Sequence, residues 1–153
     1  MQQLIDRYHL KPHPEGGYYR EVFRSGQILT SPANGEKRNA LTHIYFLLAR
    51  GQVSRLHKVL HDEVWNFYAG DPLKLIRYDG LNITEALISG DAGDFVKIVP
   101  GGFFQAAETT GAFSLVGCTV APGFEFADFA FLSDDRRLTA DFLSKHRAYQ
   151  KFV

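Results

Sequence analysis

Strand-forming segments follow one another closely through most of this sequence, and their order limits the folds that the chain can adopt. Between residues 41 and 132 the pattern predicts a run of short strands, and turn residues separate nearly all of them. No helical pattern interrupts the run, so we expect hairpins and Greek-key connections rather than parallel crossovers. The predicted strands span residues 41–48, 53–59, 63–69, 73–78, 82–87, 95–99, 105–107, 113–120 and 127–132. The sequence therefore predicts an all-β sandwich or jelly-roll barrel.

Helical and loop patterns occupy the flanks of this run. Residues 2–8 predict a short helix, because their apolar side chains fall on one stripe before two prolines end it. Residues 18–23 predict a further strand, and the Pro, Asn and Gly content of residues 31–39 predicts an exposed loop. Helical spacing returns at about residues 134–147, with Ser133 as the expected cap.

Length and charge restrict the domain count and the partners. A chain of 153 residues suffices for one packed domain, so we expect a single domain over residues 1–153 with its core barrel at about 15–132. Aromatic residues make up 14% of the chain, which suits packed sheets. The 17 basic and 17 acidic side chains cancel, so we expect no nucleic-acid partner.

The sequence also favours a cytoplasmic protein without a membrane partner. Cys118 is the only cysteine and cannot form an internal disulfide, and the first residues lack the order of a secretory signal. No apolar run approaches the roughly 18 residues that a membrane span needs. Cys118 has apolar neighbours on its predicted strand, so we expect a buried and unreactive thiol.

The predicted hairpin between Gly51 and Gly70 carries the first candidate chemistry. His57 lies on its first strand and Glu63 on its second, and both side chains can face one interior. Val59 shares the face of His57, since alternate side chains of a strand point the same way. The hairpin therefore offers one imidazole and one carboxylate, with an apolar residue beside them.

A second segment, residues 94–109, combines a Pro-x-Gly turn with a polar strand. Pro100 and Gly102 form the turn, Gln105 follows on the strand, and Thr109 lies at its end. Together the two segments resemble the two motifs of the cupins, which are small jelly-roll barrels. In the first cupin motif, a second His occupies the position of Val59. In the second motif, a His, an Asn and an opening Gly occupy the positions of Gln105, Thr109 and Asp94.

A closer resemblance covers most of the chain. Residues 13–21 (HPEGGYYRE), 44–48, 62–73 and 115–124 are similar to a small, uncharacterised branch of single-domain cupins. The resemblance implies a cupin double-stranded β-helix with short N- and C-terminal helices, and it implies a homodimer. It supplies no agreed reaction, because one fold serves many functions.

The departures from the cupin motifs argue against a metal cofactor. Cupin metals usually take several imidazoles and one carboxylate, whereas this chain offers His57, Glu63 and the weak amide donor of Gln105. We therefore expect no cofactor, and a divalent metal, if one binds, would use these three residues. The alternative is a degraded metal-dependent oxygenase in which His61, in the turn between the strands, completes the coordination.

Without a metal, His57 and Glu63 form a candidate acid/base pair, because a barrel interior and a nearby carboxylate both alter imidazole protonation. The arrangement resembles metal-free cupins that epimerise nucleotide sugars with a His base. We expect a small-molecule barrel that isomerises or epimerises a sugar or keto acid. Two alternatives stay open, a non-catalytic ligand-binding or sensing barrel, and a His57 that only satisfies buried hydrogen bonds.

Aromatic residues near this pair predict a binding wall for a small polar or sugar-like ligand. Trp65 and Phe67 share the strand face of Glu63, and Tyr45 and Phe103 or Phe104 are further candidates for the wall. Gln105 is a polar candidate for ligand binding beside them. Aromatic residues in a β-barrel belong more often to its core.

On the strand at residues 18–23, either Tyr19 and Glu21 or Tyr18 and Arg20 face the interior. The first pair would join the ligand-binding residues. A buried Arg20 would instead indicate a carboxylate or phosphate group on the ligand.

Overall fold

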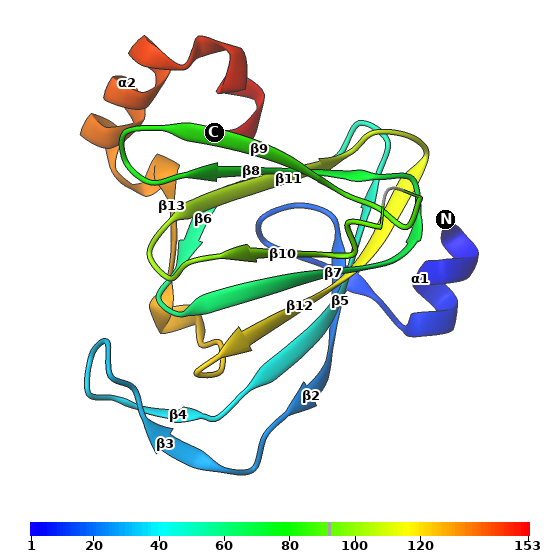
Figure 1. Ribbon diagram of the computed structural model, residues 1–153, viewed down its shortest axis with the longest axis horizontal. Helices are drawn as coiled ribbons and strands as arrows, with labels where there is room; N and C mark the ends of the chain where they lie inside the picture. Colours follow the sequence, from blue (N-terminus) through cyan, green and yellow to red (C-terminus); the bar gives the residue numbers. More distant parts are fainter. Residues whose placement is uncertain (92) are drawn as a thin grey trace.

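The computed structural model describes residues 1–91 and 93–153, and eleven of its strands form two antiparallel sheets that face each other (Figure 1). The six-stranded sheet has the order β1 (Lys11–Pro12), β2 (Tyr18–Arg24), β5 (Thr42–Ala49), β12 (Phe113–Ala121), β7 (Asp62–Gly70) and β10 (Val96–Val99). The five-stranded sheet has the order β13 (Phe129–Phe131), β6 (Val53–Val59), β11 (Phe104–Thr109), β8 (Leu73–Tyr78) and β9 (Ile83–Ile88). Strands distant in sequence are neighbours, and the expected jelly-roll barrel is confirmed.

Short helices flank the barrel, as expected. Helix α1 (Gln2–Tyr8) lies at the N-terminus, and α2 (Arg136–Lys145) lies near the C-terminus between the 3₁₀ turns η2 (Leu132–Asp134) and η3 (Arg147–Phe152). The cap of α2 is Asp135 rather than Ser133, because the Asp135 carboxylate accepts the backbone N–H groups of Arg137 and Leu138, each at 2.9 Å. No helix among the described residues is long and apolar enough to cross a membrane.

The prediction of an exposed loop over residues 31–39 is wrong in part. Its flanks form a small hairpin, with β3 (Ile28–Thr30) paired to β4 (Lys37–Asn39). Ser31 is buried, and its hydroxyl lies 2.7 Å from Nε2 of His61. His61, in the turn between β6 and β7, is 5% exposed, and this contact anchors the hairpin to the barrel.

Alternating side chains fill three apolar layers. The central layer lies between the two sheets and includes Phe46, Trp65 and Val116. A second layer lies under α2 and η3, where Tyr78, Phe142 and other side chains cover the outer face of the five-stranded sheet. The third lies between α1 and the outer face of the six-stranded sheet. The barrel is thus covered by helices at two places and retains an open end.

The turn at residues 13–17 is pressed against the barrel by two glycines. Gly16 and Gly17 have φ values of +112° and +71°, which favour glycine. A Cβ on Gly16 would lie 2.1 Å from the Val53 carbonyl oxygen, and one on Gly17 would lie 2.6 Å from the Leu47 carbonyl oxygen. This close approach carries the Glu15 side chain into the barrel, where only 6% of the residue stays exposed.

Replacing Gly16 with alanine should therefore destabilise the protein by about 2 kcal/mol or more, through backbone strain and a clash with Val53. Gly26→Ala is the matched control, because Gly26 has no positive φ and its Cβ would meet nothing within 4 Å. Thermal or urea unfolding of both variants measures the difference. Equal stabilities would show that the turn does not need its glycine.

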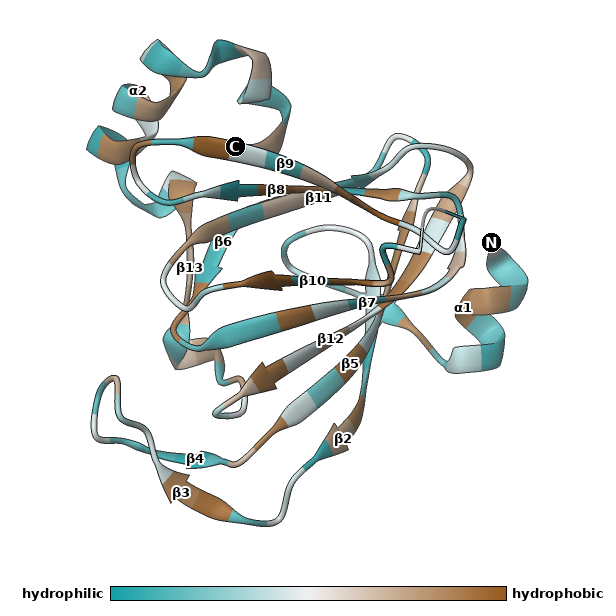
Figure 2. Cartoon of the chain, viewed as in Figure 1, coloured by the Kyte–Doolittle hydropathy of each residue, from teal (hydrophilic) through white to brown (hydrophobic). Residues whose placement is uncertain are grey.

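The outer face of the six-stranded sheet supports the expected homodimer, which stays a prediction. Its exposed side chains include Val22, Tyr68, Val96 and Ile98, which carry no charge, and Figure 2 shows the hydrophobic colouring of β10. We predict that Ile98→Asp converts a dimer to a monomer, whereas Leu87→Asp, at an exposed apolar site on β9, does not. Light scattering at micromolar concentration measures both masses, and a monomeric wild-type protein would contradict the prediction.

Candidate functional site

A cavity of about 240 Å³ enters the open end of the barrel between the two sheets. Its buried end presents three ionisable side chains, from Glu15, His57 and Glu63, each less than 7% exposed. Strands β6 and β7 supply His57 and Glu63, and the glycine turn supplies Glu15. Aromatic side chains from β2, from β13 and from the segment after β12 form much of the remaining wall. The cavity therefore combines an acidic floor with apolar sides.

His57 and Glu15 are in direct contact. The Nε2 atom of His57 lies 3.0 Å from Oε2 of Glu15, and the other Glu15 oxygen accepts a 3.0 Å bond from the Ser54 hydroxyl. On the other side of the ring, Nδ1 lies 2.7 Å from the Arg55 carbonyl oxygen, which can only accept. Burial raises the pKa of Glu15 to about 8 and lowers the pKa of His57. Both shifts favour the uncharged forms, so at neutral pH a protonated carboxyl lies beside a neutral imidazole.

Glu63 reaches the same imidazole through Gln105. The Gln105 amide nitrogen lies 3.2 Å from His57 Nε2 and donates a short hydrogen bond to Oε2 of Glu63. The Gln105 amide oxygen accepts from the indole N–H of Trp65 at 2.9 Å. Burial raises the pKa of Glu63 to about 7, and the nearby His57 opposes that shift. The second carboxyl therefore changes its charge close to neutral pH, as a general base requires.

His13 extends the polar floor towards the N-terminal strand. Its Nδ1 atom accepts the backbone N–H of Glu15 at 3.2 Å, and its ring meets the Tyr19 ring edge to face at 4.4 Å. Burial lowers the pKa of His13 to about 3, with smaller contributions from His57 and Lys11. His13 is therefore neutral and orients the turn that carries Glu15.

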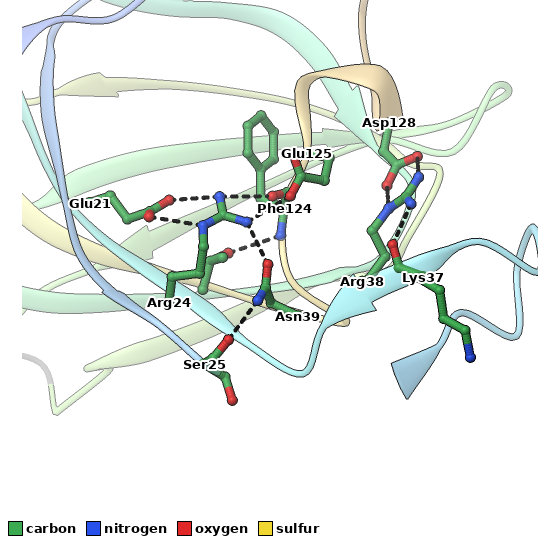
Figure 3. Close-up of polar contacts among 10 residues, drawn as sticks. Glu21, Arg24, Ser25, Lys37, Arg38, Asn39, Phe124, Glu125 and Asp128 are labelled. Atoms are coloured by element: carbon green, nitrogen blue, oxygen red, sulfur yellow. Dashed lines mark hydrogen bonds and ion pairs between the residues drawn. The ribbon is translucent and has the colours of Figure 1, made fainter. Parts of the chain in front are cut away.

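An ion-pair network holds the exposed end of the cavity (Figure 3). The Arg24 guanidinium donates to Glu21 at 2.9 and 3.0 Å and to Glu125 at 2.7 Å. It also donates to the Phe124 carbonyl oxygen at 3.2 Å, and its hydrogen bonds with Glu21 contribute most to raising the Arg24 pKa. A second pair, Arg38 with Asp128 at 2.6 Å, holds the far end of the same segment. The segment after β12 is thus attached to β2 and β4.

This attachment positions an aromatic wall. The Phe129 ring stacks on the His57 ring with centroids 5.2 Å apart and planes 19° from parallel. Phe124 and Phe126 pack edge to face with each other and with Phe129 at 5.0 to 6.3 Å. A flat or apolar ligand face can contact these rings while its polar groups reach the floor.

The structure brings together some of the residues that the sequence singled out. His57 and Glu63 share the cavity, and so do Tyr19 and Glu21, which settles the orientation of β2. Arg20 points elsewhere and donates to the Tyr8 carbonyl oxygen at 3.2 Å.

Other predicted ligand residues lie outside this cavity. Trp65 and Gln105 are at most 1% exposed and lie behind the floor rather than on it. Tyr45 lines a separate groove on the outer face, because alternation along β5 turns its neighbour Ile44 inward instead. Phe67 faces inward, but it lies about 13 Å along β7 from Glu63 and packs in the central core.

Several cavity residues were not predicted as site residues. Glu15 and His13 occur within the segment HPEGG, whose paired glycines were the available signal for a tight approach. Arg24 and Glu125 are 101 residues apart, so spacing in the sequence gives no indication of their contact. Cys118 also lines the cavity, beside Glu63, and burial raises its pKa well above the usual value. That thiol is therefore buried, as expected, and protonated at neutral pH, and its lack of reactivity stays a prediction.

The floor does not fit a divalent metal. Among residues 1–91 and 93–153, no three His, Cys, Asp or Glu side chains are placed to hold an ion. Val59 lines the cavity without a donor atom, and Gln105 turns its amide N–H groups, which are not ligands, towards His57 and Glu63.

We predict that the wild-type protein binds no Mn²⁺, Ni²⁺ or Zn²⁺ in calorimetric titration. The double variant Val59→His/Gln105→His should gain binding, because it would add two imidazoles beside His57 and Glu63. Stoichiometric metal on the wild-type protein would contradict this prediction and favour an oxygenase.

The raised carboxyl pKa values predict a pH-dependent stability. The ordinary pKa of a glutamate carboxyl is 4.5, so both carboxyls are ionised in the unfolded chain between pH 6.5 and 8. In the folded protein Glu15 and Glu63 still bind protons in this pH range, because their pKa values are raised. The free energy of unfolding should therefore fall as pH rises through this window. The lowered pKa values of His13 and His57 act below pH 6.5, where they make stability rise with pH.

Urea unfolding from pH 6.5 to 8 measures this slope. Glu15→Gln should flatten it, whereas Glu85→Gln, on the outer surface of β9, should leave it unchanged. An equally steep fall in both variants would contradict the assignment of the slope to Glu15.

Comparison with known proteins gives a family match. A family model described as the Cupin superfamily (DUF985) matches residues 2–132. The uncharacterized protein YML079W of Saccharomyces cerevisiae is 30% identical over 157 residues, which cover 90% of this chain and 78% of that protein. A hypothetical protein from Leishmania major has a TM-score of 0.87 at 32% identity, covering 98% of this chain and 96% of its own.

Two further solved structures extend the comparison. Protein SO0799 from Shewanella oneidensis has a TM-score of 0.85 at 32% identity, covering 99% of this chain and 95% of its own. An oxalate decarboxylase variant from Bacillus subtilis has a TM-score of 0.61 at 14% identity, covering 85% of this chain and 32% of its own. At that identity the likeness shows the fold alone, and enzymes are among the proteins that share it.

Proposed function

Because the chain belongs to the cupin superfamily, we propose that its barrel binds a small sugar or keto acid and isomerises or epimerises it by proton transfer. The observation that carries this proposal is the pair of buried carboxyls that flank the His57 imidazole at the cavity floor. The pKa values of Glu15 and Glu63, about 8 and about 7, lie just above and at neutral pH. One carboxyl is thus prepared to give a proton and the other to take one.

The chemistry needs only these groups. The Glu63 carboxylate removes a proton from the carbon beside a carbonyl group, and the electron pair of the broken C–H bond forms a carbon–carbon double bond. The protonated Glu15, in contact with His57, gives its proton to the carbonyl oxygen, so an enediol or enol results. Glu63 can then return its proton to the neighbouring carbon of an enediol while the hydroxyl on the other carbon gives its proton to Glu15 and becomes the new carbonyl group, which isomerises the molecule. Returning the proton to the opposite face of the original carbon, with the enol hydroxyl giving its proton back to Glu15, epimerises it. Neither outcome changes the oxidation level of the substrate as a whole.

The size and lining of the cavity favour this ligand class. Its volume of about 240 Å³ lies below the range of about 300–1,000 Å³ that is typical of drug-sized ligands. Hydroxyl and carbonyl groups match a floor that both donates and accepts hydrogen bonds. The rings of Phe124 and Phe129 match the apolar face of a sugar.

Solvent deuterium exchange tests the reaction class even while the product is unidentified. The wild-type protein should catalyse exchange at the carbon beside the carbonyl group in at least one member of a panel of sugars and keto acids, followed by NMR in D₂O. Glu63→Gln and His57→Asn should lower the exchange rate by about 100-fold or more.

Two variants serve as matched controls for this experiment. Glu85→Gln changes an outer-surface carboxylate, and His9→Asn changes an exposed imidazole whose φ of 52° suits asparagine. Both should exchange like the wild-type protein. An exchange rate that Glu63→Gln and His57→Asn leave unchanged, in folded variants, would contradict the proposed roles.

A non-catalytic ligand-binding or sensing barrel is the second candidate. The polar groups of the floor already satisfy one another, since Glu15, His57 and Gln105 all have partners within the protein. Such a network can hold a ligand without changing it. Saturable binding of a panel member in a chelator-insensitive thermal shift, with no deuterium exchange, would favour this candidate.

A further inference from the structure

We propose that Gln105 is a positioning residue that keeps Nε2 of His57 unprotonated. As a consequence Glu15, rather than His57, carries the proton that the cavity presents to a ligand. Neither Gln105 nor Trp65, its partner, lines the cavity, so both act through the residues that do.

The chain of contacts starts at the indole of Trp65. An indole N–H can only donate, and the Trp65 residue is 1% exposed, so its N–H needs a protein acceptor. That acceptor is the Gln105 amide oxygen, 2.9 Å away. A reversed amide would place the NH₂ group of Gln105 against the indole N–H. Trp65 therefore fixes which end of the amide faces the cavity floor.

The amide nitrogen of Gln105 then points at two groups. One N–H of the amide donates a hydrogen bond to Oε2 of Glu63. The other N–H faces His57, whose Nε2 lies 3.2 Å from the amide nitrogen. Gln105 is 0% exposed, so water does not compete for these protons. A hydrogen on Nε2 would meet the amide hydrogen, so that two donors would repel each other. An unprotonated Nε2 instead accepts the amide hydrogen with its lone pair.

The opposite nitrogen of His57 specifies the same tautomer. Nδ1 lies 2.7 Å from the Arg55 carbonyl oxygen, which accepts a hydrogen and cannot supply one. The ring is therefore held as a neutral imidazole with its hydrogen on Nδ1 and its lone pair on Nε2. Both ends of the ring are specified, one by the backbone and one by Gln105.

Glu15 approaches the same nitrogen, whose one lone pair already faces the Gln105 N–H. Its Oε2 atom is 3.0 Å from Nε2, and an ionised carboxylate there would place lone pair against lone pair. The burial that raises the Glu15 pKa favours the protonated form as well. Glu63 differs, because it accepts an N–H of Gln105, and that bond favours its ionised form. Gln105 thus separates the two carboxyls into a proton donor and a proton acceptor.

The tautomer is a property of the ligand-free protein, and only the role of Glu15 toward a ligand rests on the proposed function. The two ring nitrogens of His57 are distinguished by long-range ¹H–¹⁵N NMR of ¹⁵N-histidine-labelled protein at pH 7. The resonances are assigned by their loss in His57→Asn. We expect a protonated Nδ1 and an unprotonated Nε2 in the wild-type protein.

Two variants test whether Gln105 and Trp65 cause this pattern. Gln105→Glu keeps the shape but replaces the donating NH₂ with an acceptor, so the Nε2 resonance should shift to that of a protonated nitrogen. Trp65→Phe removes the indole N–H and frees the amide to turn, so a protonated Nε2 population should appear. Because the second variant leaves Gln105 in place, the proposal stays testable if Gln105→Glu fails to fold.

Phe46→Leu is the matched control for packing. The Phe46 ring meets the Trp65 ring edge to face at 5.9 Å, so this variant disturbs the same core without removing the N–H. The His57 tautomer should stay as in the wild-type protein. A protonated Nε2 in the wild-type protein, a tautomer unchanged in both test variants, or an equal change in Phe46→Leu would overturn the proposal.

Deuterium exchange separates this inference from the proposed function. If the expected tautomer is observed but no exchange occurs, the role of Gln105 is supported and the proposed enzymatic function is contradicted. If exchange occurs in a protein whose Nε2 is protonated, the enzymatic function is supported and the role of Gln105 is contradicted.

Discussion

The contact between Glu15 and His57 is the interaction on which the rest of the site depends. It joins the N-terminal turn to the barrel hairpin, and it is possible only because Gly16 and Gly17 let the turn approach the strands. Two ionisable groups buried side by side are stable when both are uncharged, since a buried and unpaired charge is costly. The proton on Glu15 therefore stabilises the turn and defines the cavity floor at the same time.

The same reasoning explains how a metal-binding fold can hold a proton instead. The cupin motifs place donor atoms around one point of the barrel, and this chain has Val59 and Gln105 at two of those places. Valine contributes only bulk, while the Gln105 amide is turned by Trp65 so that it donates rather than accepts. What remains is a set of hydrogen-bonded carboxyl, imidazole and amide groups. Such a set suits proton transfer on a small molecule.

The sequence predicted the barrel and half of the floor. The strands were predictable because alternation and turn residues are local, and His57 with Glu63 belong to one hairpin of fixed spacing. Glu15 lies 42 residues before His57, and nothing in the local pattern predicts that its turn would enter the barrel. Tyr45 was assigned to the wall because aromatic residues suit a wall, but the direction of a side chain depends on the strand register.

The site requires that Glu15 be protonated at neutral pH, and carboxyl ¹³C NMR measures that protonation. Protein labelled at the glutamate carboxyl carbon is titrated from pH 4 to 9, and the Glu15 resonance is assigned by its loss in Glu15→Gln. We predict a protonated Glu15 carboxyl at pH 7 that ionises at about pH 8. A Glu15 resonance that is already that of a carboxylate at pH 6 would show that the cavity floor holds a charged carboxylate instead.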